Sequence, residues 1–188
     1  MNGAAIVLVL KFLAGGLTGL TVHESGHVAT GIMFGAHPGT MRISYAGIPF
    51  FAVTHEPVTR TKEFIISSAG LWMQHAGSEL ILSKRPDLRH ESAPFLKGVL
   101  AFNTATSAVY ATAAFGKLGP PERDTRGMAV SLGQRGWREP SIGAFILAPA
   151  ALDVYRYFRP DQKWAVWASR GSKAVFMALV LFAGRPVP

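Results

Sequence analysis

The chain has 188 residues, enough for one domain, and no cysteine, which excludes a disulfide framework and a thiolate metal site. Hydrophobic residues make up 49% and charged residues 16% of the sequence. A soluble domain carries about 25% charged residues, so the composition favours an integral membrane protein. The formal charge of +8 comes from Lys and Arg between apolar stretches, not from a dense basic run. We therefore expect basic loops that face anionic lipid, and no nucleic-acid partner.

Five apolar stretches approach the length of about 20 residues that a transmembrane helix needs. They lie at about residues 4–34, 64–82, 95–115, 142–158 and 164–183. The first exceeds the hydrocarbon thickness, so we expect it to tilt or to break near Gly15, Gly16 and Gly19. It lacks a basic start and a cleavage motif, so we expect it to be retained and not removed as a signal peptide. The last stretch is weaker, because Arg170 and Lys173 interrupt it.

Two connecting segments differ in character. Residues 38–60 mix aromatic and β-branched residues with turn signals at Gly47 and Pro49, which predicts extended backbone over residues 41–55. Residues 116–141 are rich in Gly, Pro and Arg, and we expect a long basic loop there. The predicted fold is an α-helical integral membrane protein, a single domain over residues 1–188. It has four to five transmembrane helices and a short membrane-associated β-hairpin after the first.

The sequence TVHESGHVAT, residues 21–30, places costly polar groups at the end of the first apolar stretch. Positions i and i+4 share one face of a helix, so His23 and His27 can both point a ring nitrogen at one zinc ion. Glu24 can reach water at the metal without being a ligand. This is the H-E-x-x-H pattern of zinc hydrolases. Ionisable groups inside a membrane segment are usually functional, which favours this interpretation over a helix end at the lipid interface.

A catalytic zinc site needs a third protein ligand and one open position. Three ionisable residues within apolar stretches can supply the ligand: His75, Glu79 and Asp153. Each also has an ordinary structural explanation, since Asp153 can pair with Arg156, and Glu79 can pair with a basic residue after the second stretch. Spacing alone leaves the choice open.

Four motifs make the sequence similar to the intramembrane zinc metalloproteases of the site-2 protease family. HESGH matches the H-E-x-G-H of the family, and MRISYAGIPFFAVTHEP lies where the family has a short β-segment. EFIISSAGLWMQ resembles the AAGP-x-x-N opening of a following helix, with Leu71 replacing Pro and Gln74 replacing Asn. LAPAALDV resembles the N-x-x-P…L-D-G segment that carries the third ligand, with Val154 replacing Gly and no Asn.

The resemblance implies zinc held by His23, His27 and Asp153, with Glu24 as general base. It also implies that an unwound substrate pairs with the β-segment, and the residues expected to bind it are Ile43, Tyr45, Phe50 and Gln74. The expected activity is hydrolysis of a peptide bond in a transmembrane protein, in a bacterial inner membrane. The expected partners are that substrate, membrane lipids and a membrane complex or a second copy of the chain. The departures from the motifs motivate one alternative, a non-catalytic scaffold subunit. A metal-dependent enzyme that acts on lipid is a weaker one.

Overall fold

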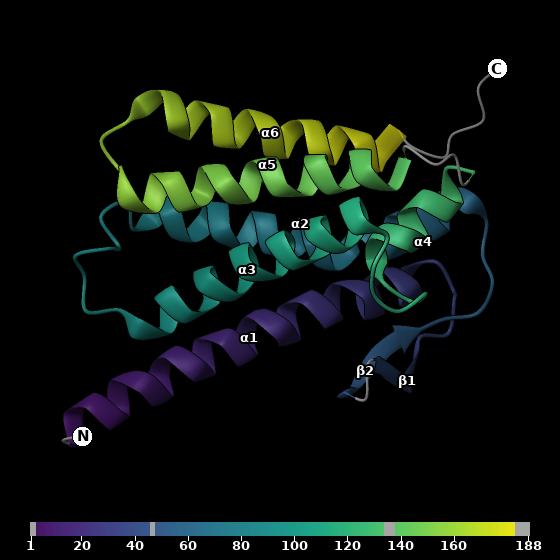
Figure 1. The fold of residues 1–188 in the computed structure, drawn as a ribbon, viewed down its shortest axis with the longest axis horizontal. Helices are drawn as coiled ribbons and strands as arrows, with labels where there is room; N and C mark the ends of the chain where they lie inside the picture. Colours follow the sequence, from purple (N-terminus) through teal and green to yellow (C-terminus); the bar gives the residue numbers. More distant parts are fainter. Residues whose placement is uncertain (1–2, 46–47, 134–137, 183–188) are drawn as a thin grey trace.

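The computed structural model describes residues 3–45, 48–133 and 138–182 (Figure 1). In these ranges the chain forms six helices and one two-stranded sheet. In chain order the elements are α1 (Gly3–Met33), β1 (Gly39–Tyr45), β2 (Ile48–Thr54), α2 (Arg60–Lys84), α3 (Pro94–Gly116), α4 (Asp124–Ser131), α5 (Arg138–Phe158) and α6 (Lys163–Phe182). The mostly helical fold and the hairpin after the first helix are as predicted, and the five long helices coincide with the five apolar stretches.

The first helix is continuous, so the prediction of a break at its glycines is wrong. Gly15 and Gly19 lie instead on the buried face that packs against α3. A Cβ on Gly15 would collide with the backbone of Phe95, and a Cβ on Gly98 would collide with the backbone of Phe12. Small residues at such a crossing let two helix backbones approach closely. These glycines therefore set the distance between α1 and α3.

The long helices form a bundle in which α3 packs between α1 and α5, and α6 covers α5 (Figure 1). The helix α2 contacts every other helix of the bundle. Its buried residues join those of α4, α5 and α6 in the main core cluster, which includes Phe64, Leu71, Met128, Ile146 and Phe176. The core thus ties the short helix α4 to the long helices.

The short helix α4 lies in residues 116–141, where we predicted a long loop, and that prediction is wrong for Asp124–Ser131. The side chain of Met128 is fully buried in the core cluster. At the start of the helix, Arg123 and Thr125 contact the carboxylate of Glu139 on α5, at 2.7 and 3.2 Å. A polar segment with one buried apolar residue and one buried ion pair can be well anchored without an apolar stretch of its own.

The hairpin places β1 antiparallel to β2, with Gly39 opposite Thr54 and Ile43 opposite Phe50. It lies at the same end of the bundle as the last turns of α1 and the helix α4 (Figure 1). A backbone hydrogen bond from Glu56 to Ala36, 2.8 Å long, closes the segment that contains the hairpin. The hairpin is therefore held against the end of α1 that carries the two histidines.

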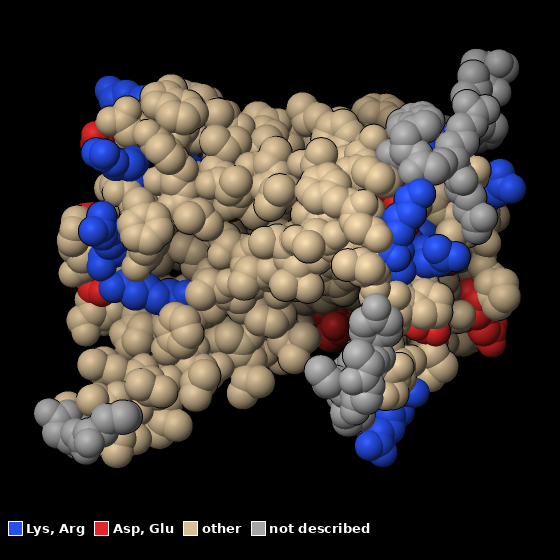
Figure 2. Space-filling view, viewed as in Figure 1, with Lys and Arg blue, Asp and Glu red and all other residues tan. Residues whose placement is uncertain are grey.

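Two helices of the described chain, α1 and α6, are long and apolar enough to cross a membrane by length and composition. The first half of α1 exposes a continuous set of large apolar side chains, from Ile6 to Leu20, each more than 40% exposed. Figure 2 shows a face on which charged side chains gather at the two ends of the bundle, with an uncharged band between them. This distribution is typical of a protein that contacts lipid around its middle.

Candidate metal centre

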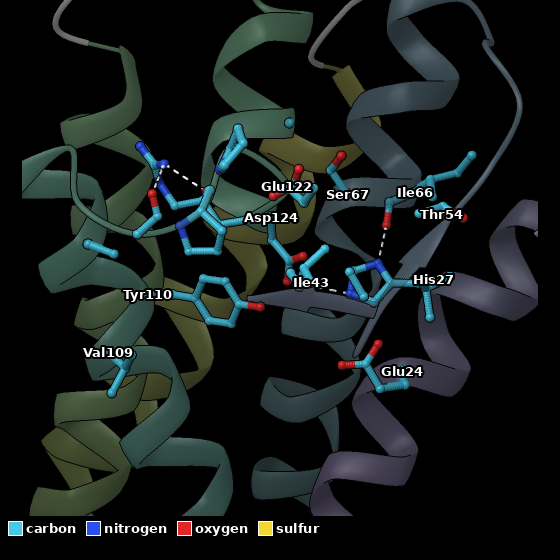
Figure 3. A pocket seen from close by; sticks show the side chains of 18 of the residues that line it. Glu24, His27, Ile43, Thr54, Ile66, Ser67, Val109, Tyr110, Glu122 and Asp124 are labelled. Carbon is cyan, nitrogen blue, oxygen red and sulfur yellow. Dashed lines mark hydrogen bonds and ion pairs between the residues drawn. The ribbon is translucent and has the colours of Figure 1, made fainter. Parts of the chain in front are cut away.

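Two buried histidines, 2% and 6% exposed, begin the site. His23 and His27 are one turn apart on α1, and their Nε2 atoms are 3.2 Å from each other. The Nδ1 atom of His27 lies 2.7 Å from the carbonyl oxygen of Ile66 on α2 (Figure 3). A carbonyl only accepts, so Nδ1 of His27 carries a proton and donates it. In the neutral ring this leaves the lone pair of Nε2 directed at His23.

The ring of His23 is held between two helices. On one side it stacks against the ring of Tyr110 on α3, with centroids 5.8 Å apart and planes at 16°. On the other side it lies over Gly70 of α2, where a Cβ would come within 2.5 Å of its ring atoms. Only glycine leaves room for the imidazole in this position. Gly70, the last residue of the S-A-G segment of α2, therefore serves the site because it has no side chain.

A third ligand atom comes from Asp124, at the start of α4. Its Oδ2 atom lies 3.2 Å from Nε2 of His23 and 3.4 Å from Nε2 of His27. Zinc bonds of about 2.0–2.1 Å at tetrahedral angles would place two ligand atoms about 3.3–3.4 Å apart. All three separations in this group lie close to that value. The group of His23, His27 and Asp124 can therefore hold a metal ion.

The electrostatics of the group also favour a cation. Oδ2 of Asp124 is buried and makes no hydrogen bond within the described part of the chain. Burial alone would raise the pKa of this carboxyl group, but the charge of His27 and the contacts with both histidines outweigh burial and hold it well below its usual range. The carboxylate thus stays ionised at neutral pH. Lone pairs of two imidazoles and a carboxylate repel each other unless a proton or a metal ion lies between them.

The position of Asp124 depends on how α4 is anchored. Met128, one turn further along α4, is fully buried in the core. A Cβ on Gly127 would collide with the hydroxyl group of Ser67, so α4 lies close against α2. The hydroxyl group of Tyr110 is directed at the Asp124 carboxylate and can donate to it (Figure 3). The third ligand is therefore fixed by contacts with α2, α3 and the core.

A pocket of about 910 Å³ opens beside these residues (Figure 3). Glu24, His27 and Asp124 line it together with residues of the hairpin, α2 and α3. The Glu24 carboxylate lies on the wall next to His27. Apolar residues such as Val109, Ala113 and Leu118 make up much of the remaining wall. The volume is in the range of sites for small molecules or short peptide segments.

The predicted residues are only partly brought together. His23 and His27 come together, and Glu24 lines the pocket beside His27, but Asp153 lies elsewhere and does not join the histidines. Its Oδ1 atom lies 2.7 Å from the ammonium group of Lys173 and accepts a hydrogen bond from Ser169, also 2.7 Å long. This fully buried carboxylate thus neutralises a cation of α6. The structure offers Asp124 in place of Asp153 as the third ligand.

The two other possible third ligands are also away from the histidines. Glu79 contacts three cations of α5 and α6: Arg156 at 2.5 Å, and Arg170 and Lys173 at 2.8 Å. His75 is buried with its ring edge against Phe176, 5.4 Å between centroids. Both belong to the interface of α2 with α5 and α6.

The four expected substrate-binding residues have different outcomes. Ile43 of β1 lines the pocket (Figure 3). The side chains of Tyr45 and Phe50 lie outside the described residues. Gln74 is 1% exposed and does not line the pocket. Of the two residues in this set whose side chains are described, Ile43 lies where it can touch a substrate and Gln74 does not.

Two residues of the site were not singled out in the sequence, Asp124 and Tyr110. Asp124 is the first residue of the segment D-T-R-G-M-A-V, which follows two prolines. Proline before a segment and a carboxylate in its first turn are signals of a helix N-terminus. Those signals could have located α4. Tyr110 lies in an apolar stretch without any motif, so nothing local marked it.

No protein-family model matches the chain, and no curated protein and no solved structure matches it. The fold and the site define a helical protein with a His–His–Asp group that can hold a metal ion, next to a pocket that a glutamate lines.

Proposed function

We propose that the protein is a zinc-dependent endopeptidase of the site-2 protease type, which hydrolyses a peptide bond of a membrane protein. The observation that carries the proposal is the approach of three ligand atoms from His23, His27 and Asp124 to within 3.2–3.4 Å of each other, beside Glu24 in one pocket. Nitrogen and oxygen ligands of this kind suit zinc, and three protein ligands leave a position open.

The residues of the site divide the chemistry between them. A zinc ion held there supplies Lewis acidity, which polarises the scissile carbonyl group and acidifies water. Glu24 is not needed as a ligand, and its carboxylate on the pocket wall can take a proton from the attacking water. The same carboxyl group then gives the proton to the leaving amine. Ile66 keeps the proton of His27 on Nδ1, so that Nε2 stays free for the metal.

The hairpin supports a peptide as the substrate. Ile43 and Ala52–Thr54 line the pocket, so the sheet and the metal ligands border one space. A helical peptide bond resists attack, because its C=O and N–H groups are bonded within the helix. A two-stranded sheet has an outer edge on each strand, and an unwound substrate can pair with such an edge. We infer that the hairpin presents the extended substrate to Glu24.

We place the protein in a membrane, with α1 and α6 as spanning helices, and assign it to the inner membrane of a bacterium. The exposed apolar half of α1 and the charged ends of the bundle support this placement (Figure 2). The two histidines of the site lie in the last third of α1, near one end of the bundle (Figure 1). Water and an unwound substrate can both reach such a position.

The test compares the wild-type protein with Glu24→Gln, which keeps size and hydrogen bonding but cannot accept the proton. Glu91→Gln, near the other end of the bundle and paired with Arg85, is the matched control. A mass-spectrometric survey of membrane proteins that accumulate with Glu24→Gln identifies the substrate, which is then reconstituted with each purified variant. We expect equal zinc content in all three and a loss of cleavage of at least about 10²-fold in Glu24→Gln alone. Unchanged cleavage at full zinc content would refute the role of Glu24 as general base, whereas a survey in which no protein accumulates, with no cleavage by the wild-type protein, would refute the proposal and favour the scaffold alternative.

A further inference from the structure

Several buried side-chain polar groups have no hydrogen-bond partner among the described residues, and two of them, besides that of Asp124, bear on the metal centre. One is Nδ1 of His23, and the other is the side-chain amide of Gln74, both its nitrogen and its oxygen. Both residues are almost completely buried, at 2% and 1% exposed. Buried polar groups are nearly always paired, directly or through water, so two such groups in one region call for a common explanation.

The helix geometry places these two groups next to each other. The imidazole of His23 lies against Gly70 of α2, and Gln74 is one turn further along the same face of that helix. Long side chains on an α-helix lean back toward its N-terminus and cover the preceding turn. The amide of Gln74 therefore extends toward Gly70, where no side chain obstructs it. This direction leads toward the ring of His23, which lies over Gly70.

The backbone around Gln74 is held in place by α3. The side-chain nitrogen of Asn103 donates to the carbonyl oxygen of Gln74 and to the hydroxyl group of Ser78, at 3.1 Å each. These bonds fix the turn that carries Gln74, while the N–H donors and the oxygen acceptor of its side-chain amide stay unpaired among the described residues. The amide is a preset polar group beside a ligand.

When Nε2 of His23 binds a metal ion, its Nδ1 carries a proton and needs an acceptor. The other ligand, His27, already has one in the carbonyl group of Ile66. Metal-binding histidines almost always donate their second N–H to such a partner, which orients the ring. We propose that Gln74 is the positioning residue of His23: its Oε1 atom accepts the Nδ1 proton, through a buried water or by a turn of the amide.

This inference rests on the proposed function, because it needs metal at the His–His–Asp group. It gives Gln74 a role inside the bundle instead of contact with the substrate. The test measures zinc affinity by competition with a chelating dye and records the Co²⁺ absorption spectrum, which reports ligand geometry. Unfolding temperature in the presence of a chelator reports the stability of the metal-free fold.

Gln74→Met keeps the length of the side chain but removes the acceptor, and Gln74→Glu retains an acceptor. Ser78→Ala is the matched control, since Ser78 is buried on the same face one turn away. We expect Gln74→Met to weaken zinc binding about 10–100-fold and to alter the cobalt spectrum. Gln74→Glu should bind within about threefold of wild type, or more tightly, and Ser78→Ala should bind as wild type does. Should Gln74→Met fail to fold, Gln74→Asn, which is one methylene too short, replaces it.

Wild-type affinity and an unchanged cobalt spectrum in Gln74→Met would overturn the inference but leave the proposed function intact. A weaker affinity in Ser78→Ala, equal to that in Gln74→Met, would also overturn it, because general loosening of α2 would then be the cause. If the wild-type protein bound neither zinc nor cobalt, the proposed function would fail first, and this inference would fail with it.

Discussion

Replacing Asp124 by asparagine tests the geometry of the metal centre directly. The change keeps the shape of the side chain but removes the negative charge that faces both histidines at 3.2 and 3.4 Å. Its matched control is Asp153→Asn, another buried carboxylate, which contacts Lys173 and Ser169 and lies away from the histidines. The sequence motif predicts Asp153 as the ligand, whereas the structure offers Asp124, so the pair of variants distinguishes the two.

The expected magnitude follows from the number of ligands. Apparent binding free energies of structural zinc sites with four ligands are ~10–16 kcal/mol, or about 2.5–4 kcal/mol for each ligand. At 1.4 kcal/mol for each factor of ten, loss of one ligand weakens binding about 10²–10³-fold. Asp153→Asn removes only contacts with charged partners, each of which contributes about 1.5–3 kcal/mol to stability. It should therefore lower the unfolding temperature and leave zinc affinity unchanged.

The assay is competition of each purified variant with a chelating dye, with thermal unfolding of the metal-free protein measured on the same samples. The two variants should show opposite profiles: Asp124→Asn with weak zinc binding, Asp153→Asn with reduced stability. Should Asp124→Asn bind zinc like the wild type while Asp153→Asn loses it, the third ligand has been misassigned. The distances between the three ligand atoms would then have no functional meaning.

Three further predictions concern the support of the site. Gly70→Ala should displace the ring of His23 and weaken zinc binding about 10–100-fold. Gly77→Ala on the same helix, where a Cβ makes only an ordinary contact, should leave zinc binding unchanged. Equal zinc binding by both variants would contradict the role of Gly70 in positioning His23. Gly98→Ala should cost about 1–3 kcal/mol of stability, measured by thermal unfolding in detergent, because the new Cβ meets backbone atoms of α1 that cannot move aside. Removal of zinc by a chelator should raise hydrogen exchange in Asp124–Ser131 much more than in α3, since the metal holds the start of α4; equal protection with and without the chelator would mean that α4 is anchored by its other contacts alone.

Most of the architecture could be predicted because its signals are local. A long apolar run is visible in the sequence, and the five runs coincide with α1, α2, α3, α5 and α6. The alternation around Gly47 gave the hairpin. The first helix was expected to tilt or to break, and the break was considered because its glycines suggest flexibility when they are examined alone. Their role is apparent only when Gly98 lies opposite Gly15.

The metal centre was predictable only for the part that one helix supplies. His23, Glu24 and His27 share a turn, so their spacing carries the chemistry. Asp153 was chosen because LAPAALDV resembles the segment that carries the third ligand in the site-2 protease family, but in the structure its carboxylate pairs with Lys173, 20 positions away on another helix. Asp124 was missed because its polar, proline-rich surroundings resemble a loop. Its relation to the histidines exists only in the folded chain.

The distribution of the three ligands along the chain also has a consequence for biosynthesis. His23 and His27 are made early, and Asp124 follows His27 by 97 positions. At roughly 5–20 residues per second, a nascent chain carries two ligands for roughly 5–20 s before the third exists. In that interval α1 can enter the membrane, but the site lacks the carboxylate that completes it. The proposed peptidase thus lacks a complete metal site while it is inserted beside other newly made membrane segments. No inhibitor is needed to keep it inactive during that interval.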